Sequence, residues 1–354
     1  MVKKTISQKS GNGNKQIEHV KEEFTGKNLT RFGGSGLIRR FFKRHRIKEE
    51  LEERVRVEGR RKSKYSPGSM FVSCLYGIFL GYWRPSQMEI LCADKVFQKV
   101  ASLFAFPVQS TISRFLTSLK VSVAREIASF NFDLLMKFRG SFKRFKSITL
   151  DLDSHVMPVY GNQQRAAFGY NPKKRGRKSY HPLLCFIGET RDYIGGLFRS
   201  GRHHSSYNAI LFLKKIIKRL PAHIEMIRLR ADSSFFSHEM IKFLIKKAIE
   251  FYIVVPMQPW VQRKIRQISN WKSIGGGVEA GECEYVITKA ITIRMIVVRE
   301  KVKKGKTPRK QLKLLNIGDV IYDYQVIVTN SDKEPEEVWR YYNQRACCEN
   351  FIKE

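Results

Sequence analysis

Residues 147–153 have the sequence SITLDLD, in which apolar and polar residues alternate. Alternation with a period of two predicts a β-strand and places Asp151 and Asp153 on the same face of that strand. A second apolar stretch, residues 224–232, has the sequence IEMIRLRAD and is also typical of a strand, which ends in Asp232. Carboxylates at the ends of neighbouring strands can converge on one point, where hard oxygen ligands favour Mg²⁺ or Mn²⁺. Taken alone, however, Asp232 is better explained as a turn or helix-cap residue.

The pattern around these two strands predicts an α/β domain. Further strands are expected at residues 182–187, 193–198 and 251–255, and helices at residues 207–220 and 237–250. This order of three strands followed by helix, strand, helix and strand favours a mixed sheet over a doubly wound parallel one.

A different rhythm follows in residues 256–320, which contain Trp260, Trp271 and β-type stretches at 284–287 and 291–298. We interpret this segment as a β-rich insertion whose tryptophans pack in its core rather than stack on a base. The main domain then resumes with a strand at residues 324–329 and a helix that opens at Glu334 and Pro335.

The first part of the chain is expected to be helical. A single charged helix is expected at residues 37–61 and a buried helix at residues 70–83. Ser110 is expected to cap a short helix, which is either a helix-turn-helix reader of DNA or a packing helix that turns Ile112 and Phe115 inward.

These patterns divide the chain into five parts, each with an expected character. The parts are a basic disordered tail (1–36), a helical DNA-binding region (37–140), the first part of the α/β core (141–255), the β-rich insertion (256–320) and the second part of the core (321–354).

The composition points to a polyanionic partner. The chain of 354 residues has 66 Lys and Arg against 32 Asp and Glu, a net charge of +34. A folded protein this basic repels itself unless it binds a polyanion, and nucleic acid is the partner that releases condensed counterions. The six cysteines form no CxxC pair, which argues against zinc and for free thiols in a reducing cytosol. The sequence shows no secretory signal and no apolar stretch long enough to span a bilayer, so no membrane partner is expected.

A run of basic residues between two expected strands is too charged to pack in a core. We interpret it as a hairpin tip that contacts phosphates, because phosphate contacts dominate affinity for DNA; the alternative is a merely soluble loop. Its charged residues are Lys173, Lys174, Arg175, Arg177 and Lys178.

The last expected helix carries Tyr342, Arg345 and Glu349 at positions i, i+3 and i+7, hence on one face. This stripe is either a solvated face or a buried one. Apolar neighbours on the same helix favour burial, and a buried Glu349 needs a cation or Arg345 as its partner.

These residues resemble the motifs of a known family. The arrangement of Tyr342, Arg345 and Glu349 resembles the third motif of bacterial insertion-sequence transposases of the DDE class, in the branch written Tyr-Arg-Glu-Lys. The stretch LDLDS at residues 150–154 resembles the first motif, and RADSSF at residues 230–235 the second. The segment GYNPKKRGRKSYHPLL at residues 169–184 is similar to the stretch that follows the first Asp in these proteins. The likeness covers residues 65–354.

The resemblance implies an RNase H-like fold with a β insertion between the second Asp and the Glu. It favours Asp153 as the first ligand, with Asp151 as the alternative. Two Mg²⁺ or Mn²⁺ ions are implied, held by Asp153, Asp232 and Glu349, with Asp153 common to both. The implied activity is cleavage and transfer of DNA strands, with a hairpin intermediate and with Tyr342 and Arg345 gripping the nearby strand.

The implied partners are double-stranded DNA, as transposon ends and target, and a second copy of the chain in a synaptic homodimer. No small-molecule cofactor is implied, and the expected location is the bacterial cytoplasm, at the nucleoid. The family motif ends in a Lys that lies beyond Glu354, so we expect a C-terminally truncated protein. Two alternatives remain open, an RNase H-like nuclease that cuts without joining strands and an inactive remnant that only binds DNA.

Overall fold

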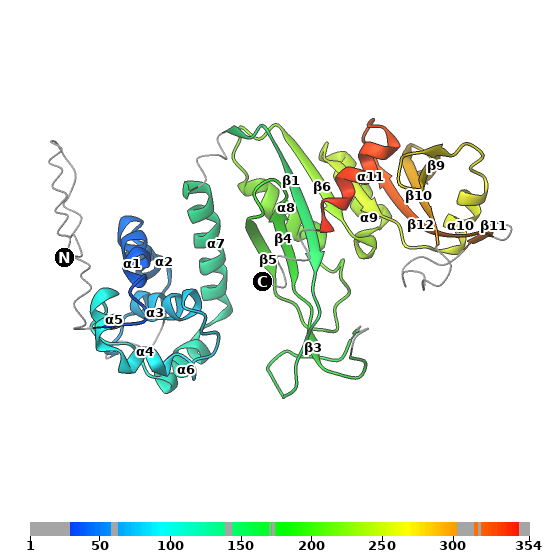
Figure 1. Cartoon of the computed structure of the whole chain (residues 1–354). Coiled ribbons are helices and arrows are strands. Elements are labelled where there is room, and N and C mark those ends of the chain that lie inside the picture. Colours follow the sequence, from blue (N-terminus) through cyan, green and yellow to red (C-terminus); the bar gives the residue numbers. More distant parts are fainter. Residues whose placement is uncertain are drawn as a thin grey trace, which may run out of the picture. The chain divides into compact units, whose positions relative to one another are not determined.

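The structure is a computed structural model. It describes residues 29–57, 63–138, 144–169, 171, 174–302, 315–317 and 320–346. The chain divides into two compact units, Met1–Phe130 and Asn131–Glu354 (Figure 1). The described part of the first unit is helical, and the second is built on a large mixed sheet. Among the described residues, no helix combines the length and apolarity needed to cross a bilayer.

The first unit is held by an aromatic core. Its helices are α1 (Ser35–Arg44), α2 (Ile47–Arg54), α3 (Pro67–Phe79), α4 (Glu89–Ala93), α5 (Lys95–Val100), α6 (Gln109–Ser118) and the start of α7 (Val121–Phe138). The buried ring of Tyr76 meets Phe42 and Phe97 edge-on, with centroids 5.2 and 5.7 Å away. Edge-to-face pairs of this kind add to the free energy gained by burying apolar area. Ser66 caps α3 by accepting the Ser69 N–H at 3.2 Å, and Pro67 occupies the first helical position.

Several helix boundaries in this unit differ from the expectation. The single charged helix expected at residues 37–61 is two helices, because Arg46 between them has a left-handed backbone with φ 51°. Within the expected tail (1–36), Phe32 is buried and α1 starts at Ser35. Residues 1–28 of the expected tail lie outside the described residues.

The expected cap of α6 is wrong. The helix starts at Gln109 behind Val108, which forms no side-chain cap, so Ser110 lies inside the first turn. Ile112 and Phe115 are buried, as the packing interpretation requires.

The second unit is a mixed sheet, as the sequence predicts. Its strands follow the order β5 (Tyr193–Leu197), β4 (Leu183–Ile187), β1 (Ser147–Ser154), β6 (Met226–Ala231), β7 (Glu250–Val254), β12 (Val320–Thr329), β10 (Ile291–Lys301), β9 (Val278–Thr288) and β8 (Lys272–Ser273), with β11 (Leu315–Ile317) beside β12. Strand β1 runs antiparallel to β4 and parallel to β6, and β6 runs parallel to β7. This arrangement is an RNase H-like sheet.

The β-rich segment after β7 continues this sheet. Strand β12 pairs with β7 on one side and with β10 on the other, and both pairings are antiparallel. Strand β9 then pairs with β10 along nearly its whole length. Trp271 packs against the core of the second unit, and Trp260 packs there through a stacked contact with Tyr285 whose centroids are 4.5 Å apart. Helix α10 (Pro259–Arg266) carries Trp260.

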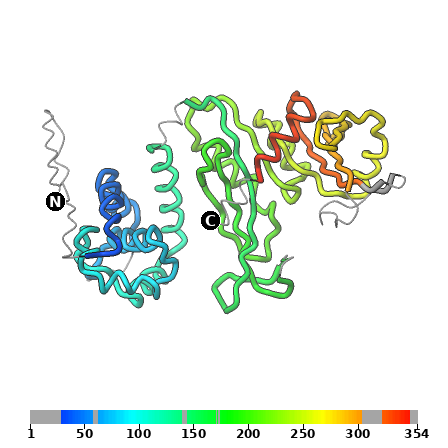
Figure 2. Tube along the Cα trace, in the orientation of Figure 1, coloured from blue at the N-terminus to red at the C-terminus, as the bar shows by residue number. Residues whose placement is uncertain are grey.

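Helices cover the two faces of the sheet differently. Phe251 and Ile253 of β7 share the main core with α8 (Ala209–Arg219) and α9 (His238–Lys246), whereas Tyr252 between them packs with α11 (Pro335–Asn343). Alternate residues of a strand point to opposite faces, so α11 lies on the face opposite α8 and α9. Figure 2 shows α11, in red, crossing beside the much earlier strands β1 and β6.

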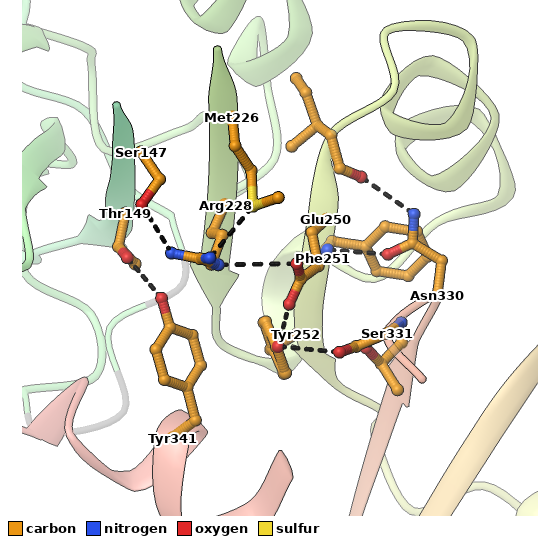
Figure 3. A network of polar contacts seen from close by, with 12 residues as sticks. Ser147, Thr149, Met226, Arg228, Glu250, Phe251, Tyr252, Asn330, Ser331 and Tyr341 are labelled. Atoms are coloured by element: carbon orange, nitrogen blue, oxygen red, sulfur yellow. Dashed lines mark hydrogen bonds and ion pairs between the residues drawn. The ribbon is translucent and has the colours of Figure 1, made fainter. Parts of the chain in front are cut away.

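A polar network ties α11 to the sheet (Figure 3). The hydroxyl of Tyr341 contacts the hydroxyl of Thr149 on β1. Behind it, Arg228 on β6 donates to Ser147 at 3.2 Å and pairs with Glu250 at 3.5 Å. The Thr149–Tyr341 contact joins α11 to β1, and the bonds of Arg228 join β6 to β1 and β7.

Candidate active site

Two predicted carboxylates lie at the same edge of the sheet. Strands β1 and β6 are parallel, and their last paired residues are Leu152 and Ala231. Asp153 is the next residue of β1, and Asp232 is the residue that directly follows β6. The carboxyl ends of parallel strands meet at one edge, which brings these two acids to neighbouring positions.

Both acids line one pocket of about 520 Å³, together with two further residues of the predicted site, Tyr342 and Arg345. Asp151 does not line it. The remaining lining residues are Ser233, Val254, Val255, Pro256, Met257, Val278, Val298, Glu300, Asp323, Tyr324, Gln325, Val326, Trp339, Asn343 and Ala346. Glu349, the third predicted ligand, lies outside the described residues.

Asp153 is paired with Arg345. Nη2 of Arg345 donates to Oδ1 of Asp153 over 2.9 Å, and Asp153 and Arg345 are only 9% and 5% exposed. A carboxylate that is buried so far needs a positive partner, because burial without one costs several kcal/mol. The pair therefore holds the segment after α11 against the end of β1.

Asp232 begins a short 3₁₀ turn, η2 (Ser233–Phe235). Its Oδ1 accepts the Ser234 N–H at 3.0 Å and the Ser234 hydroxyl at 2.6 Å. Asp232 is thus a cap, as its position alone suggests, and it also lines the pocket. The cap fixes the orientation of the carboxylate at the strand end.

Asp151 forms a different ion pair. Nε and Nη2 of Arg230 donate to its two oxygens at 2.6 and 2.7 Å, and both side chains are buried. Burial raises the pKa of the Asp151 carboxyl, and the Arg230 bonds and charge counter only part of that rise. Arg230 also donates from Nη1 to the carbonyl oxygen of Tyr341 at 2.8 Å. The pair therefore joins α11 to β1 and β6.

Tyr342 stands beside Arg345 in the pocket wall and is 7% exposed. Burial raises the pKa of its phenol to about 12, so the hydroxyl is neutral at physiological pH. A neutral phenol can donate a hydrogen bond to a phosphate oxygen.

The pocket also contains acids that the sequence reasoning missed. Glu300 and Asp323 lie opposite each other on β10 and β12. Oδ1 of Asp323 is buried and, within the described part of the chain, has no hydrogen-bond partner. An Asp in the middle of an apolar strand in so basic a chain is the signal that would have singled it out.

A buried histidine near the site was also missed. Nδ1 of His181 lies 2.9 Å from the carbonyl oxygen of His203, so Nδ1 carries the proton, and Nε2 faces the hydroxyl of Ser154 at 3.1 Å. Ser154 directly follows Asp153. Burial lowers the pKa of His181, which is therefore neutral and accepts a hydrogen bond from Ser154.

Two carboxylates of the pocket are of the hard oxygen type that divalent cations prefer. Within residues 29–57, 63–138, 144–169, 171, 174–302, 315–317 and 320–346, no group of three or more His, Cys, Asp or Glu is placed to hold a metal ion. Asp153 and Asp232 nevertheless supply hard carboxylate oxygens to one pocket. The guanidinium of Arg345 already places a positive charge beside Oδ1 of Asp153, and a bound cation would place its charge at the same carboxylate.

The predicted basic tip lies on an arm between β2 (Met157–Pro158) and β3 (Ser179–Tyr180), which extends from the sheet in Figure 1. Lys174 and Arg177 lie over the ring of Tyr160, at 4.7 and 5.1 Å from its centroid, and that ring is 64% exposed. The bond from Lys174 lowers the pKa of the Tyr160 phenol. These contacts present the charges at the surface.

The other predicted residues of the arm are placed as follows. Arg175 is exposed, and Lys178 donates to Asn162 at 3.1 Å. Lys173 lies outside the described residues.

Comparisons with known proteins give one family model and similar solved structures. The family model described as "Transposase DDE domain group 1" matches residues 12–354. A piggyBac transposase synaptic complex with hairpin DNA is similar at 13% identity and a TM-score of 0.45, over 90% of this chain and 67% of that chain. The Drosophila P element transposase strand transfer complex is similar at 14% identity and a TM-score of 0.28, over 61% and 43%. The comparison with curated proteins gives no match.

Proposed function

The chain belongs to the transposase DDE domain group 1 family, and on that premise we propose that it cleaves and transfers the DNA strands of an insertion sequence by cut-and-paste transposition. The observation that carries the proposal is the shared pocket, in which Asp153 and Asp232 meet Tyr342 and Arg345. Asp153, Asp232 and Glu349 are the residues that would hold two Mg²⁺ or Mn²⁺ ions, with Asp153 common to both. Such ions, when bound, activate the attacking oxygen and stabilise the leaving oxygen of an in-line displacement.

The chain's own residues have separate tasks in this proposal. Arg345 brings a guanidinium to the pocket, where it neutralises a phosphate oxygen of the strand to be cut. Tyr342 donates a hydrogen bond from its neutral hydroxyl to the same strand. Water displaces the 3′ oxygen of the element's end from phosphorus, and the free 3′-OH later displaces a 3′ oxygen in the target. Between these steps the 3′-OH attacks the phosphate of the opposite strand and displaces a 3′ oxygen of the flanking DNA, which forms the hairpin. A second water then displaces the element's 3′ oxygen from the hairpin phosphate and frees the 3′-OH again.

The basic arm supplies affinity rather than chemistry. Lys173, Lys174, Arg175, Arg177 and Lys178 contact the phosphates of the bound end, and contacts of this kind position a duplex without reading its sequence. The partners are double-stranded DNA and a second copy of the chain in a synaptic homodimer, and the reaction takes place at the nucleoid in the bacterial cytoplasm.

The test is cleavage of a duplex that carries the terminal sequence of the element encoding the chain. Asp153→Asn, Asp232→Asn and Glu349→Gln should each abolish Mg²⁺-dependent cleavage and leave binding of that duplex in EDTA unchanged. Glu225→Gln is the matched control, because it removes an exposed carboxylate outside the pocket. Normal cleavage by any of the three variants excludes that residue as a ligand.

A second assay separates the alternatives. Wild-type chain is given pre-cleaved ends and a target duplex, and joined products show strand transfer. Cleavage without joining indicates a nuclease, and binding without either indicates an inactive remnant.

A further inference from the structure

A groove lined by lysines lies between α8 and α9, on the face of the sheet opposite α11. The groove has a volume of about 580 Å³ and is lined by Lys214, Ile217, Lys218, Phe243, Lys246 and Lys247. All four lysines are exposed, whereas Phe243 is buried at its floor. Nζ of Lys214 lies 5.7 Å from the centroid of the Phe243 ring. The groove is therefore an apolar floor with cationic walls.

Neighbouring acids do not balance these charges. Within the described part of the chain, none of the four lysines forms an ion pair, and Glu239 is the one acid in the sequences of α8 and α9. Lys214 and Lys218 are separated by one helical turn, where like charges cost a few tenths of a kcal/mol. The folded chain thus keeps together charges that repel each other.

Helix dipoles explain only part of the arrangement. Lys218, Lys246 and Lys247 lie at the C-terminal ends of α8 and α9, where a positive charge is favoured. Lys214 lies in the middle of α8 and gains nothing from the dipole. A polyanion that spans both helices accounts for all four positions.

The chemistry of the lining identifies the polyanion. Lysine is a point charge suited to phosphate, and the lining has neither the planar fork of Arg nor the amide of Asn or Gln that pairs with a base edge in two hydrogen bonds. Its ring is buried at the floor, so no stacking platform for an unpaired base is present in the lining. These features fit the backbone of a duplex bound without regard to sequence.

We propose that this lysine groove binds the phosphate backbone of a second DNA duplex, distinct from the strand in the catalytic pocket. The sheet separates the two sites, and a duplex with a persistence length of about 50 nm does not fold around one domain at low cost. The inference rests on the proposed function, which requires both an element end and a target duplex. Because both react together in the pocket at strand transfer, the groove holds a duplex segment that is not reacting in the pocket of the same copy.

The experiment uses the full chain and a fluorescent mixed-sequence duplex without element ends. The groove variant carries Lys214→Ala, Lys218→Ala, Lys246→Ala and Lys247→Ala, and a charge-keeping variant has Arg at the same four positions. The matched control carries Arg263→Ala, Arg266→Ala, Lys272→Ala and Lys289→Ala, which remove the same charge elsewhere in the second unit. Thermal unfolding of each protein checks that it is folded.

The groove variant should bind the duplex at least about tenfold more weakly at 0.1 M salt, with a salt slope reduced by up to about 3 to 4. The charge-keeping variant and the control should bind like wild type. Cleavage of saturating element-end duplex should persist in the groove variant, so a failure of the proposed function is recognised separately by loss of cleavage in the wild type.

Three results would overturn the inference. These are wild-type affinity and salt slope in the groove variant, an equal loss in the control, and a loss confined to an RNA duplex of the same length.

Discussion

The guanidinium of Arg345 and the carboxylate of Asp153 form a buried ion pair 2.9 Å long, although 192 residues separate them in the sequence. The pair places a positive charge on the carboxylate that the proposed mechanism assigns to both metal ions. Arg345 and a bound cation therefore act on the same buried negative charge. The change in unfolding free energy on adding metal, measured with and without Arg345, shows whether the cation can replace the guanidinium.

Arg345→Ala should lower the free energy of unfolding in EDTA by about 3–5 kcal/mol, because it removes one partner of a buried pair. Mn²⁺ should restore part of that loss. Urea unfolding with and without Mn²⁺ measures both effects. In a double-mutant cycle with Asp153→Asn, the double variant should lose about 0.5–3 kcal/mol less than the sum of the two single losses. Strict additivity would show that the pair contributes nothing.

Asp151 should prove structural. Arg230→Met alone should cost about 3–5 kcal/mol, whereas Asp151→Leu combined with Arg230→Met should be close to neutral, because an apolar pair of similar volume replaces both charges. The Thr149–Tyr341 contact still anchors α11 in the double variant. Titration calorimetry with Mn²⁺ should give wild-type affinity for the double variant and none for Asp153→Asn. A folded double variant that fails to bind Mn²⁺ would make Asp151 a ligand.

The base of the basic arm depends on Gly201. A Cβ at this position would clash with the backbone oxygen of Ser179 and lie 2.6 Å from the carbonyl oxygen of Ala167. Gly201→Ala should therefore lower stability by about 1–3 kcal/mol and weaken binding of the element end without changing the net charge. Gly34→Ala, which meets open space, is the matched control. Unchanged affinity in Gly201→Ala would separate the arm from DNA binding.

His181 should make the protein sensitive to mild acid. Burial lowers its pKa in the folded state, with Arg199 and His204 adding to the effect and Asp232 opposing it. In the unfolded chain the pKa of His181 is near 6.5. At pH values between the lowered pKa of the folded state and about 6.5, the unfolded chain therefore binds more protons than the folded chain. The free energy of unfolding should have its full value above about pH 6.5 and should fall as the pH drops through this window.

Urea unfolding at a series of pH values measures this loss. His181→Gln should flatten the profile, whereas His238→Gln, at an exposed position, should keep it. An identical acid loss in His181→Gln and wild type would assign the sensitivity to other groups.

The mixed RNase H-like sheet was predictable because its strands carry local signals. Alternation in residues 147–153 and the apolar run that ends at Asp232 each set a strand without reference to the rest of the chain. Placing Asp153 beside Asp232 needed the parallel pairing of β1 and β6, which the motif resemblance implied. The assignment of Glu349 as a ligand stays a prediction.

The features that were missed depend on distant partners. The unpaired oxygen of Asp323 has meaning only because β12 forms a wall of the pocket, and His181 matters only because its ring reaches Ser154. The break at Arg46 reflects how α1 and α2 pack, which overrides the helix propensity of a charged stretch. A sequence window of a few residues marks Asp323 as an acid within an apolar stretch, but it does not identify the distant partners of these residues.

The continuity of the sheet from β7 through β12 to β9 has a consequence for shortened copies of the gene. If residues 272–301 are deleted, β12 loses its neighbour and presents a row of unsatisfied N–H and C=O groups to solvent. Such an edge recruits strands from other molecules. Internal deletions in this region should therefore yield an insoluble product rather than a smaller working enzyme, which leaves point substitution as the main route by which this segment can change.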